Sequence, residues 1–278
     1  MDKICKKYKN RLQTQKANVE DFGPIMYNDQ YKVLYCQVPK VASTNWRRVF
    51  LILSGKMNTT DPTKISSIQA GRGLGEHLHY LSQLEPQEIQ FRLKNYLKFM
   101  VVREPFERLL SAYRNKLGAG SSTNYYFHTR YGKGIIKKYR KNPTNKSLEN
   151  GHDVSFREFI EYIIDPERKD RLNPHWATYH ELCLPCIVNY NYILRYKTLT
   201  EDSNRIIDKL GVSDILKFPS RSTAYRHSKT SSLLYDFYKT LPSKIMSKLI
   251  DFYYLDFALF NYTLPSVLKN LTRMNSFS

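Results

Sequence analysis

A short polar stretch stands where an apolar run gives way to the start of a helix. Lys40 follows Pro39 at the end of this run, and the residues after it include three that can donate hydrogen bonds from backbone and side chain: Ser43, Thr44 and Asn45. Backbone N–H groups at a helix N-terminus bind phosphate-like anions, and a neighbouring lysine strengthens such a site. The stretch therefore predicts a first anion-binding site, which we call an anion grip.

A second stretch of the same kind lies 63 residues further along the chain. Arg103 follows the buried strand expected over 98–102, and Pro105 suits the first turn of a helix that would carry Ser111. We expect Arg103 and Ser111 to bind a second anion. A nucleotide with one phosphate group at its reactive end and another on its ribose would occupy both grips.

The first stretch is not a Walker A loop. That loop needs the pattern Gly-x-x-x-x-Gly-Lys-Ser/Thr, and no glycine stands between Val33 and Leu53. The sequence therefore gives little support to an ATPase or a nucleotide kinase.

The elements that must position both grips alternate between strands and helices. We expect strands over 31–38, 98–102 and 192–196, and helices over 43–53, from 86, 105–117, 156–163, 199–210 and, as the last, 242–259. We also expect a capping box at 198–201, a breaker at 118–122 and an apolar stripe on the last helix that packs against the sheet. Such alternation predicts an α/β fold with a mainly parallel sheet flanked by helices. Ligands of such sheets bind beyond the carboxyl ends of the strands, where both grips fall.

The charge of the chain indicates an anionic partner. Its 278 residues include 44 Lys+Arg against 25 Asp+Glu, a formal net charge of +19. Nucleic acid, acidic lipid and acidic polysaccharide all fit that balance. The basic residues are spread along the chain without a zinc-finger or RNA-recognition pattern, so we expect no nucleic-acid partner.

Cysteines and glycosylation sequons favour an oxidising compartment. The four cysteines include Cys183 and Cys186 in a Cys-x-x-Cys pair that lacks the second pair of a zinc ribbon, so we expect disulfides, local or long-range, rather than a metal site. Asn-x-Ser/Thr sequons occur at four positions: Asn58, Asn145, Asn261 and Asn270. No apolar run is long enough to cross a membrane, so a luminal protein would need an anchor or signal that this chain lacks.

The two stretches around Lys40 and Arg103 resemble the donor-binding motifs of one enzyme family. The segment 39–46 is similar to the 5′-phosphosulfate loop of Golgi carbohydrate sulfotransferases, and 103–114 to their 3′-phosphate motif. The resemblance is strongest to the chondroitin/dermatan 4-O-sulfotransferases, within the group that also holds the HNK-1 sulfotransferase. Further matching segments are 130–133, 175–176, 182–186, 196–202 and 255–262.

The resemblance implies a donor, a fold and a location. The donor, a co-substrate, is 3′-phosphoadenosine 5′-phosphosulfate, no metal is required, and the fold is a single α/β domain related to nucleotide kinases. We expect a stem remnant at 1–30, partly flexible, a sulfotransferase domain at 31–265 and a tail at 266–278. The full-length form would be a type II membrane protein of the Golgi, facing the lumen. The donor-binding residues carried over are Pro39, Lys40, Val41, Ala42, Ser43, Thr44, Asn45, Arg103, Glu104, Pro105, Phe106, Glu107, Arg108, Leu109, Leu110 and Ser111.

The acceptor implied by the resemblance is an acidic glycosaminoglycan or a glycoprotein glycan. The 4-hydroxyl of GalNAc in chondroitin or dermatan is the first expectation, and terminal GalNAc or the HNK-1 glucuronate the alternative. A non-catalytic glycosaminoglycan-binding protein is the alternative from another class. Basic residues that can line an acceptor groove are Arg47, Arg48, Arg130, Lys133, Lys137, Lys138 and Arg140.

The catalytic residues are less well defined than the donor site. Lys40 would stabilise charge on the leaving phosphate. His175 and His77 are the candidate general bases, with His79 and Glu104 as further possibilities.

Overall fold

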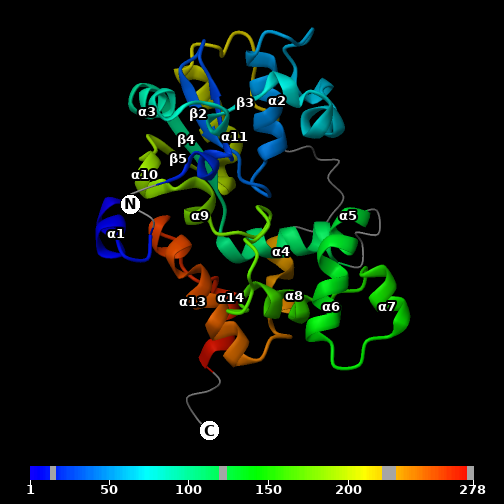
Figure 1. The fold of residues 1–278 in the computed structure, drawn as a ribbon. Helices are drawn as coiled ribbons and strands as arrows, with labels where there is room; N and C mark the ends of the chain where they lie inside the picture. Colours follow the sequence, from blue (N-terminus) through cyan, green and yellow to red (C-terminus); the bar gives the residue numbers. More distant parts are fainter. Residues whose placement is uncertain (13–16, 119–123, 221–229, 274–278) are drawn as a thin grey trace. The chain divides into compact units, whose positions relative to one another are not determined.

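The computed structural model describes residues 1–12, 17–118, 124–220 and 230–273 (Figure 1). The chain divides into two units, each described by itself. Unit 1 holds Met1–Arg103 and Thr178–Arg226, and unit 2 holds Glu104–Ala177 and His227–Ser278.

Unit 1 is built on a five-stranded sheet with the order β3-β1-β2-β4-β5. The central strand β2 runs parallel to β4, and β4 runs parallel to β5, while β1 pairs antiparallel with both β2 and β3. The strands span Ile25–Asn28 (β1), Val33–Cys36 (β2), His79–Tyr80 (β3), Leu97–Val102 (β4) and Tyr192–Arg195 (β5). The expected α/β class with a mainly parallel sheet is confirmed, and β1 and β3 are additions that the sequence did not predict.

Helices α2 and α3 cover opposite faces of this sheet (Figure 1). On one face the Trp46 ring of α2 lies 4.4 Å from Phe99 and 5.6 Å from Tyr35, measured between ring centroids. On the other face Arg92 of α3 lies 4.8 Å from the Tyr27 ring of β1. Apolar burial of the first face fixes α2 and the loop that precedes it. The helices of unit 1 are α1 Asp2–Lys7, α2 Ser43–Leu53, α3 Pro86–Asn95, α9 Tyr179–Cys183, α10 Pro185–Val188 and α11 Leu199–Lys209, and the short turns are η1 Val19–Phe22, η2 Pro62–Lys64, η3 Gln69–Gly73, η4 Gly75–His77, η5 Leu81–Gln83 and η7 Tyr196–Thr198.

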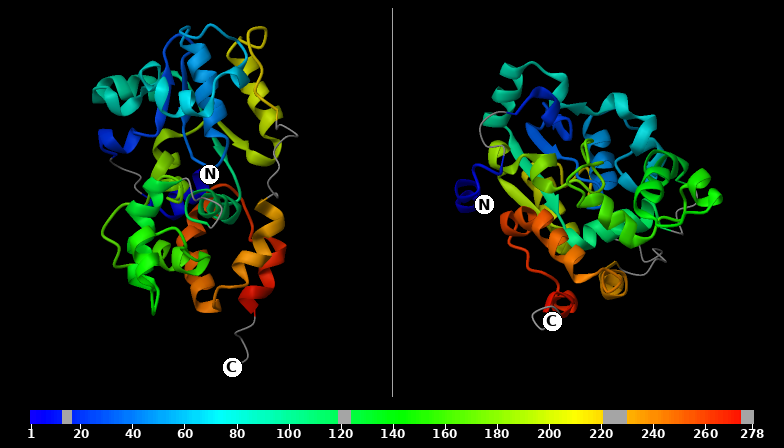
Figure 2. Two further views of the ribbon diagram at one scale, coloured as in Figure 1. Left: turned by 90° about the vertical axis from the view of Figure 1, so that its right-hand side faces the viewer. Right: turned by 60° about the horizontal axis from the view of Figure 1, so that its bottom comes forward.

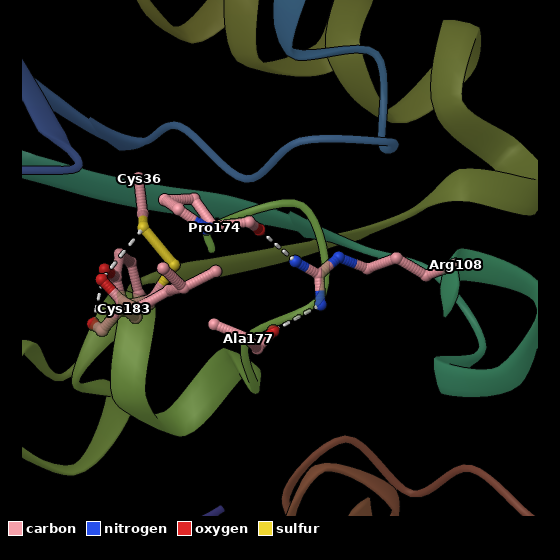
Figure 3. Close-up of a disulfide and its surroundings, with 7 residues drawn as sticks. Cys36, Arg108, Pro174, Ala177 and Cys183 are labelled. Atoms are coloured by element: carbon pink, nitrogen blue, oxygen red, sulfur yellow. Dashed lines mark hydrogen bonds between the residues drawn. A yellow bond between two sulfur atoms is a disulfide. The ribbon is translucent and has the colours of Figure 1, made fainter. Parts of the chain in front are cut away.

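Two disulfides join distant parts of unit 1. Cys36, at the end of β2, bonds to Cys183 of α9 (Figure 3), and Cys5 of α1 bonds to Cys186 of α10. The expectation of disulfides is confirmed. The two cysteines of the Cys-x-x-Cys pair each bond to a distant partner instead of to each other.

Unit 2 consists of helices (Figure 2), and several of them pack together through aromatic side chains. Phe106 of α4 stacks on Tyr238 at 5.1 Å and meets Phe257 of α13 edge to face at 5.2 Å. Tyr113 packs against Phe156 of α8 at 5.1 Å. The elements are α4 Pro105–Lys116, α5 Tyr125–Phe127, η6 His128–Gly132, α6 Lys133–Tyr139, α7 Asn145–Asn150, α8 Phe156–Ile163, η8 Thr230–Leu233, α12 Leu234–Tyr238, α13 Ser243–Leu259 and α14 Ser266–Arg273.

Three expectations about local structure were wrong. The Thr198 hydroxyl donates to Asp202 rather than capping α11, although the helix begins and ends near the expected residues. Helix α13 is followed by α14, so it is not the last helix. The apolar stripe of α13 packs on helices of unit 2, through Tyr253 and Phe257 against Phe106, because this unit surrounds the stripe with aromatic helices.

Most of the breaker expected at 118–122 lies outside the described residues. Within the described ranges, no helix combines the length and the apolar character needed to cross a bilayer.

Candidate functional site

The loop between β2 and α2 has an unusual backbone at two positions. Lys40 and Ala42 adopt φ values of 73° and 66°, in the left-handed region that residues with a side chain seldom occupy. Such strain costs about 1–3 kcal/mol per residue and is concentrated at functional sites. Gln37, at the start of the loop, donates its N–H to the carbonyl of Pro24 at 2.8 Å. The loop is therefore held in one specific path.

The first turn of α2 presents backbone donors. The residue before the helix is Ala42, whose methyl group cannot cap it, and no side chain caps this helix end. Asn45 donates its N–H to Ala42, whereas the N–H groups of Ser43 and Thr44 precede any intrahelical acceptor. Together with the positive end of the helix dipole and the cation of Lys40, this turn suits a phosphate or sulfate group.

Arg103 lies at the same edge of the sheet as this loop. Cys36 of β2 pairs with Met100 of β4 in parallel register, so Pro39 and Arg103 each stand three residues beyond that pair. The Arg103 residue is 7% exposed, and its guanidinium lies 4.6 Å from the centroid of the Tyr196 ring. A ring face attracts a cation, so this contact helps to fix the direction of the guanidinium.

The backbone of Arg103 is fixed by one buried tyrosine. The Tyr179 hydroxyl accepts the Arg103 N–H at 2.8 Å and donates to the Arg103 carbonyl at 3.1 Å. Tyr179 begins α9, and the Cys183 end of that helix is joined to Cys36 of β2 (Figure 3). The carboxyl ends of β2 and β4 are therefore connected through α9, by a disulfide on one side and two hydrogen bonds on the other.

Arg47 and Arg48, expected in an acceptor groove, are engaged within unit 1. Arg47 donates to Gln37 Oε1, to the Tyr80 hydroxyl and to the carbonyls of Ala70 and Gly71. Arg48 donates from Nη1 to Asn45 Oδ1 at 2.9 Å. Arg47 thus connects the 69–73 turn to Gln37, at the start of the loop between β2 and α2.

His77 lies on the same insertion in unit 1. The side chain is half-buried at the end of η4, and its Nε2 lies 3.6 Å from Glu76 Oε1. His79 of β3 is exposed, and its ring centroid lies 5.6 Å from that of Tyr27. Both histidines belong to the unit that carries the loop.

Beyond Arg103, the second motif builds helix α4 of unit 2. The Glu104 carboxylate caps this helix by accepting the N–H groups of Phe106 at 3.1 Å and Glu107 at 2.6 Å, with Pro105 in the first turn. Several motif side chains are buried: Pro105, Phe106, Arg108, Leu109 and Leu110. Ser111 is half-buried on the same helix. The Glu104 carboxylate therefore acts as a helix cap.

Arg108 of this helix holds the segment that carries His175. Its guanidinium donates to the carbonyls of Pro174 and Ala177, both at 2.7 Å (Figure 3). His175 Nδ1 lies 2.8 Å from Asn173 Oδ1, and the Phe127 ring meets the imidazole edge to face at 5.2 Å. An amide oxygen can only accept, so Nδ1 carries the proton and Nε2 is the basic nitrogen of the neutral ring.

The basic residues of unit 2 fall into two groups. Lys138 pairs with Asp165 at 2.5 Å, and this hydrogen bond lowers the pKa of Asp165 to about 2. Arg140 binds Asp153 and Glu158 at 2.8 and 2.7 Å. In contrast, across the part of the chain that the structure describes, Arg130, Lys133 and Lys137 form no ion pair with a carboxylate.

Unit 1 thus gathers Lys40, the α2 helix start, Arg103 and the insertion with His77, whereas unit 2 carries 104–111 and His175. The sequence reasoning did not find Tyr179, which fixes Arg103, and Tyr196 was noted only inside a matching segment. No signal at Tyr179 identifies its partner, because the two residues are 76 positions apart. In the described ranges, no three His, Cys, Asp or Glu side chains gather into a group that would hold a metal ion.

Comparisons with known proteins match the chain to one family and to several of its members. The model of one family, described as the sulfotransferase family, matches residues 23–263. Carbohydrate sulfotransferase 11 of Mus musculus is 42% identical over 251 residues, which cover 90% of this chain and 70% of that protein. Two Homo sapiens proteins are also similar: carbohydrate sulfotransferase 14, 38% identical over 88% of this chain and 61% of its own length, and carbohydrate sulfotransferase 9, 35% identical over 95% and 59%. No solved structure matches the chain.

Proposed function

The chain belongs to the sulfotransferase family, and on this premise we propose that it transfers a sulfuryl group from 3′-phosphoadenosine 5′-phosphosulfate to a hydroxyl of a carbohydrate. The observation that carries the proposal is the arrangement in unit 1, where an uncapped helix start with Lys40 and a fixed Arg103 stand at one edge of a parallel sheet. Two anion grips at that edge suit a nucleotide that carries phosphate groups at both ends.

The donor would be bound through its two anionic ends. The loop 39–45 would hold the 5′-phosphosulfate, and Arg103 would pair with the 3′-phosphate, with Ser111 assigned to the same group from the motif alone. The bound donor supplies an activated sulfate whose bond to the 5′-phosphate oxygen breaks as the acceptor oxygen bonds to sulfur. Lys40 and the N–H groups of Ser43 and Thr44 would stabilise the charge that develops on the departing phosphate.

A general base would take the proton of the acceptor hydroxyl. The structure supports His175 more than His77, because Asn173 fixes the His175 tautomer with a basic Nε2. His77 Nε2 already faces the Glu76 carboxylate at 3.6 Å, and no contact among the described residues fixes its tautomer in the way that Asn173 fixes that of His175. Glu104 is a poor base because its carboxylate already accepts two N–H groups at the start of α4.

For the acceptor we propose the 4-hydroxyl of GalNAc in chondroitin or dermatan, as the motif resemblance indicates, with terminal GalNAc or the HNK-1 glucuronate as alternatives. The formal charge of +19 suits an acidic chain. Two disulfides suit an oxidising compartment such as the Golgi lumen.

The test is transfer of labelled sulfate from the donor to chondroitin, dermatan, heparosan and an asialoglycoprotein, followed by disaccharide analysis. We expect Lys40→Ala to lower kcat by about 10²–10³, the loss typical of one transition-state donor. Arg103→Ala should raise the donor Kd, whereas Lys56→Ala, an exposed lysine beyond the end of α2, should change neither. If the folded, donor-binding protein labels none of these acceptors, the proposed sulfotransferase activity is refuted. Retained glycan binding with no donor binding in the wild type would favour the non-catalytic alternative.

A further inference from the structure

Two neighbouring tyrosine rings are exposed at the start of a helical stretch in unit 2. The exposed fraction is 77% for Tyr125 and 54% for Tyr126, although the next residue, Phe127, is buried. Phe127 stacks on Tyr131 at 5.9 Å and meets the Trp176 ring at the same distance. The buried ring thus anchors the turn while the two tyrosines face solvent. Adjacent exposed rings of this size are typical of a binding surface.

Cations continue along the same stretch, from η6 into α6. Arg130 and Lys137 are exposed and Lys133 is half-buried. Unlike Lys138 and Arg140, these three form no ion pair with a carboxylate in the described ranges. Their charge is therefore available to an external anion. The stretch presents aromatic rings at one end and uncompensated positive charge along its length.

Tyr126 belongs to the same aromatic cluster as the candidate base, because its ring meets that of Phe127 edge to face at 5.2 Å. Phe127, directly after the pair, lies 5.2 Å from the His175 ring, and Arg108 fixes the segment on which His175 stands. All of these residues lie in unit 2. A ligand held on the tyrosines is therefore bound by the part of the chain that also positions His175.

We propose that Tyr125, Tyr126, Arg130, Lys133 and Lys137 form the binding surface for an acidic polysaccharide acceptor, and we name it the tyrosine–lysine surface. This inference rests on the proposed function. A sugar ring has C–H groups on its faces and hydroxyls at its rim, so a tyrosine ring packs on the face while its hydroxyl stays in water. The cations pair with the carboxylate or sulfate groups of the same chain.

An anionic lipid surface is the competing occupant, and the side chains disfavour it. The large apolar residues exposed between 124 and 140 are the two tyrosines alone, with no exposed leucine, isoleucine or phenylalanine to enter a bilayer. The surface therefore has the chemistry of a glycan site.

The first test replaces both rings, as Tyr125→Ala with Tyr126→Ala. We expect the KM for chondroitin to rise about tenfold or more, because two stacking contacts are lost, while kcat at saturating acceptor and the donor Kd stay unchanged. Tyr235→Ala and Tyr254→Ala, which remove rings 49% and 40% exposed elsewhere in unit 2, serve as matched controls and should leave the KM unchanged. An unchanged acceptor KM in the folded double variant would overturn the proposal.

The second test concerns charge and does not depend on catalysis. Binding of the protein to immobilised chondroitin should weaken steeply with salt, and Arg130→Ala with Lys137→Ala should flatten that dependence. Lys138→Ala, next in sequence but paired with Asp165, should change it little. If the wild type binds chondroitin through this surface yet transfers no sulfate, the proposed function fails and the surface stands. The two double variants, at Tyr125 and Tyr126 and at Arg130 and Lys137, also test the lipid alternative. If they lose binding to phosphatidylserine vesicles but keep chondroitin binding, the surface is a membrane site and the proposal is wrong.

Discussion

The two disulfides of unit 1 are nested, and removing them one at a time should separate chain entropy from donor binding. Cys5–Cys186 spans 181 residues and Cys36–Cys183 spans 147. While one bond is intact, the other closes only the ring between them, about 34 residues, which is the difference between the two spans. The chain-entropy relation assigns such a ring about 4 kcal/mol and the 147-residue loop about 5 kcal/mol.

The expected stability changes follow from this nesting. Loss of either bond alone should lower the free energy of unfolding by about 4 kcal/mol, and loss of both by about 9 kcal/mol. Cys36 and Cys183 are fully buried, whereas Cys5 and Cys186 are partly exposed. Cys36→Ala with Cys183→Ala therefore leaves a cavity and should destabilise the protein more than the outer pair of substitutions, although the ring is the same.

Only the inner bond should affect the donor site. Cys36–Cys183 fixes α9, and Tyr179 at the start of α9 fixes the backbone of Arg103. We expect the inner variant to bind 3′-phosphoadenosine 5′-phosphate more weakly and the outer variant, Cys5→Ala with Cys186→Ala, to bind it as the wild type does. Urea unfolding gives the stabilities, and isothermal titration calorimetry below the transition gives the Kd. Equal stability losses together with an unchanged Kd in the inner variant would refute both steps of the reasoning.

Three further predictions concern Tyr179, His128 and the independence of the reaction from a metal. Tyr179→Phe should destabilise the protein by about 1–3 kcal/mol, because the buried Arg103 N–H loses its acceptor, and should raise the donor Kd in calorimetry. Tyr190→Phe, which removes one buried hydrogen bond to a carbonyl of α9, should lower stability alone, so an equal rise in Kd would contradict a specific role for Tyr179. Burial, and then the nearby His152, lower the pKa of His128, so His128 stays neutral in the folded protein while the unfolded chain binds a proton below about pH 6.5. Its contribution is present above that pH and lost as the pH falls, so the Tm should drop between pH 7.5 and 5.5, and less in His128→Gln; an equal drop in both would assign the effect to other groups. Finally, sulfate transfer should continue at an unchanged rate in EDTA, and a loss restored by magnesium would show that a metal is needed.

The elements that carry the site were predictable where local signals are strong. Helix α2 spans the expected residues, and α4 begins at Pro105 because Glu104 caps it and proline suits its first turn. Strand β4 was expected from a run of buried apolar residues. In contrast, β3 has two residues, too few for an alternating pattern, and its position depends on pairing with β1.

Long-range partners within the site could not be predicted from the sequence. Lys40 and Arg103 were found because each follows a strand, but the partner of Arg103 is a tyrosine 76 residues away. The basic residues show the same limit. Lys138 and Lys137 are neighbours of one type, yet only Lys138 meets Asp165, and only the folded chain decides which charge is neutralised. Cysteine pairing depends likewise on which strand and helix ends meet.

The second motif shows why similarity of a motif does not give every residue in it the same role. Arg103 belongs to unit 1, where its guanidinium stands over Tyr196 at the sheet edge. Glu104 caps α4, and Arg108 donates to two carbonyls that hold the His175 segment. These contacts would shape the fold even without a ligand, so the motif combines one side chain that we propose to bind an anion with several that position other elements. The proposed binding role of Arg103 therefore rests on its own geometry, whereas the neighbouring residues fix the elements around it.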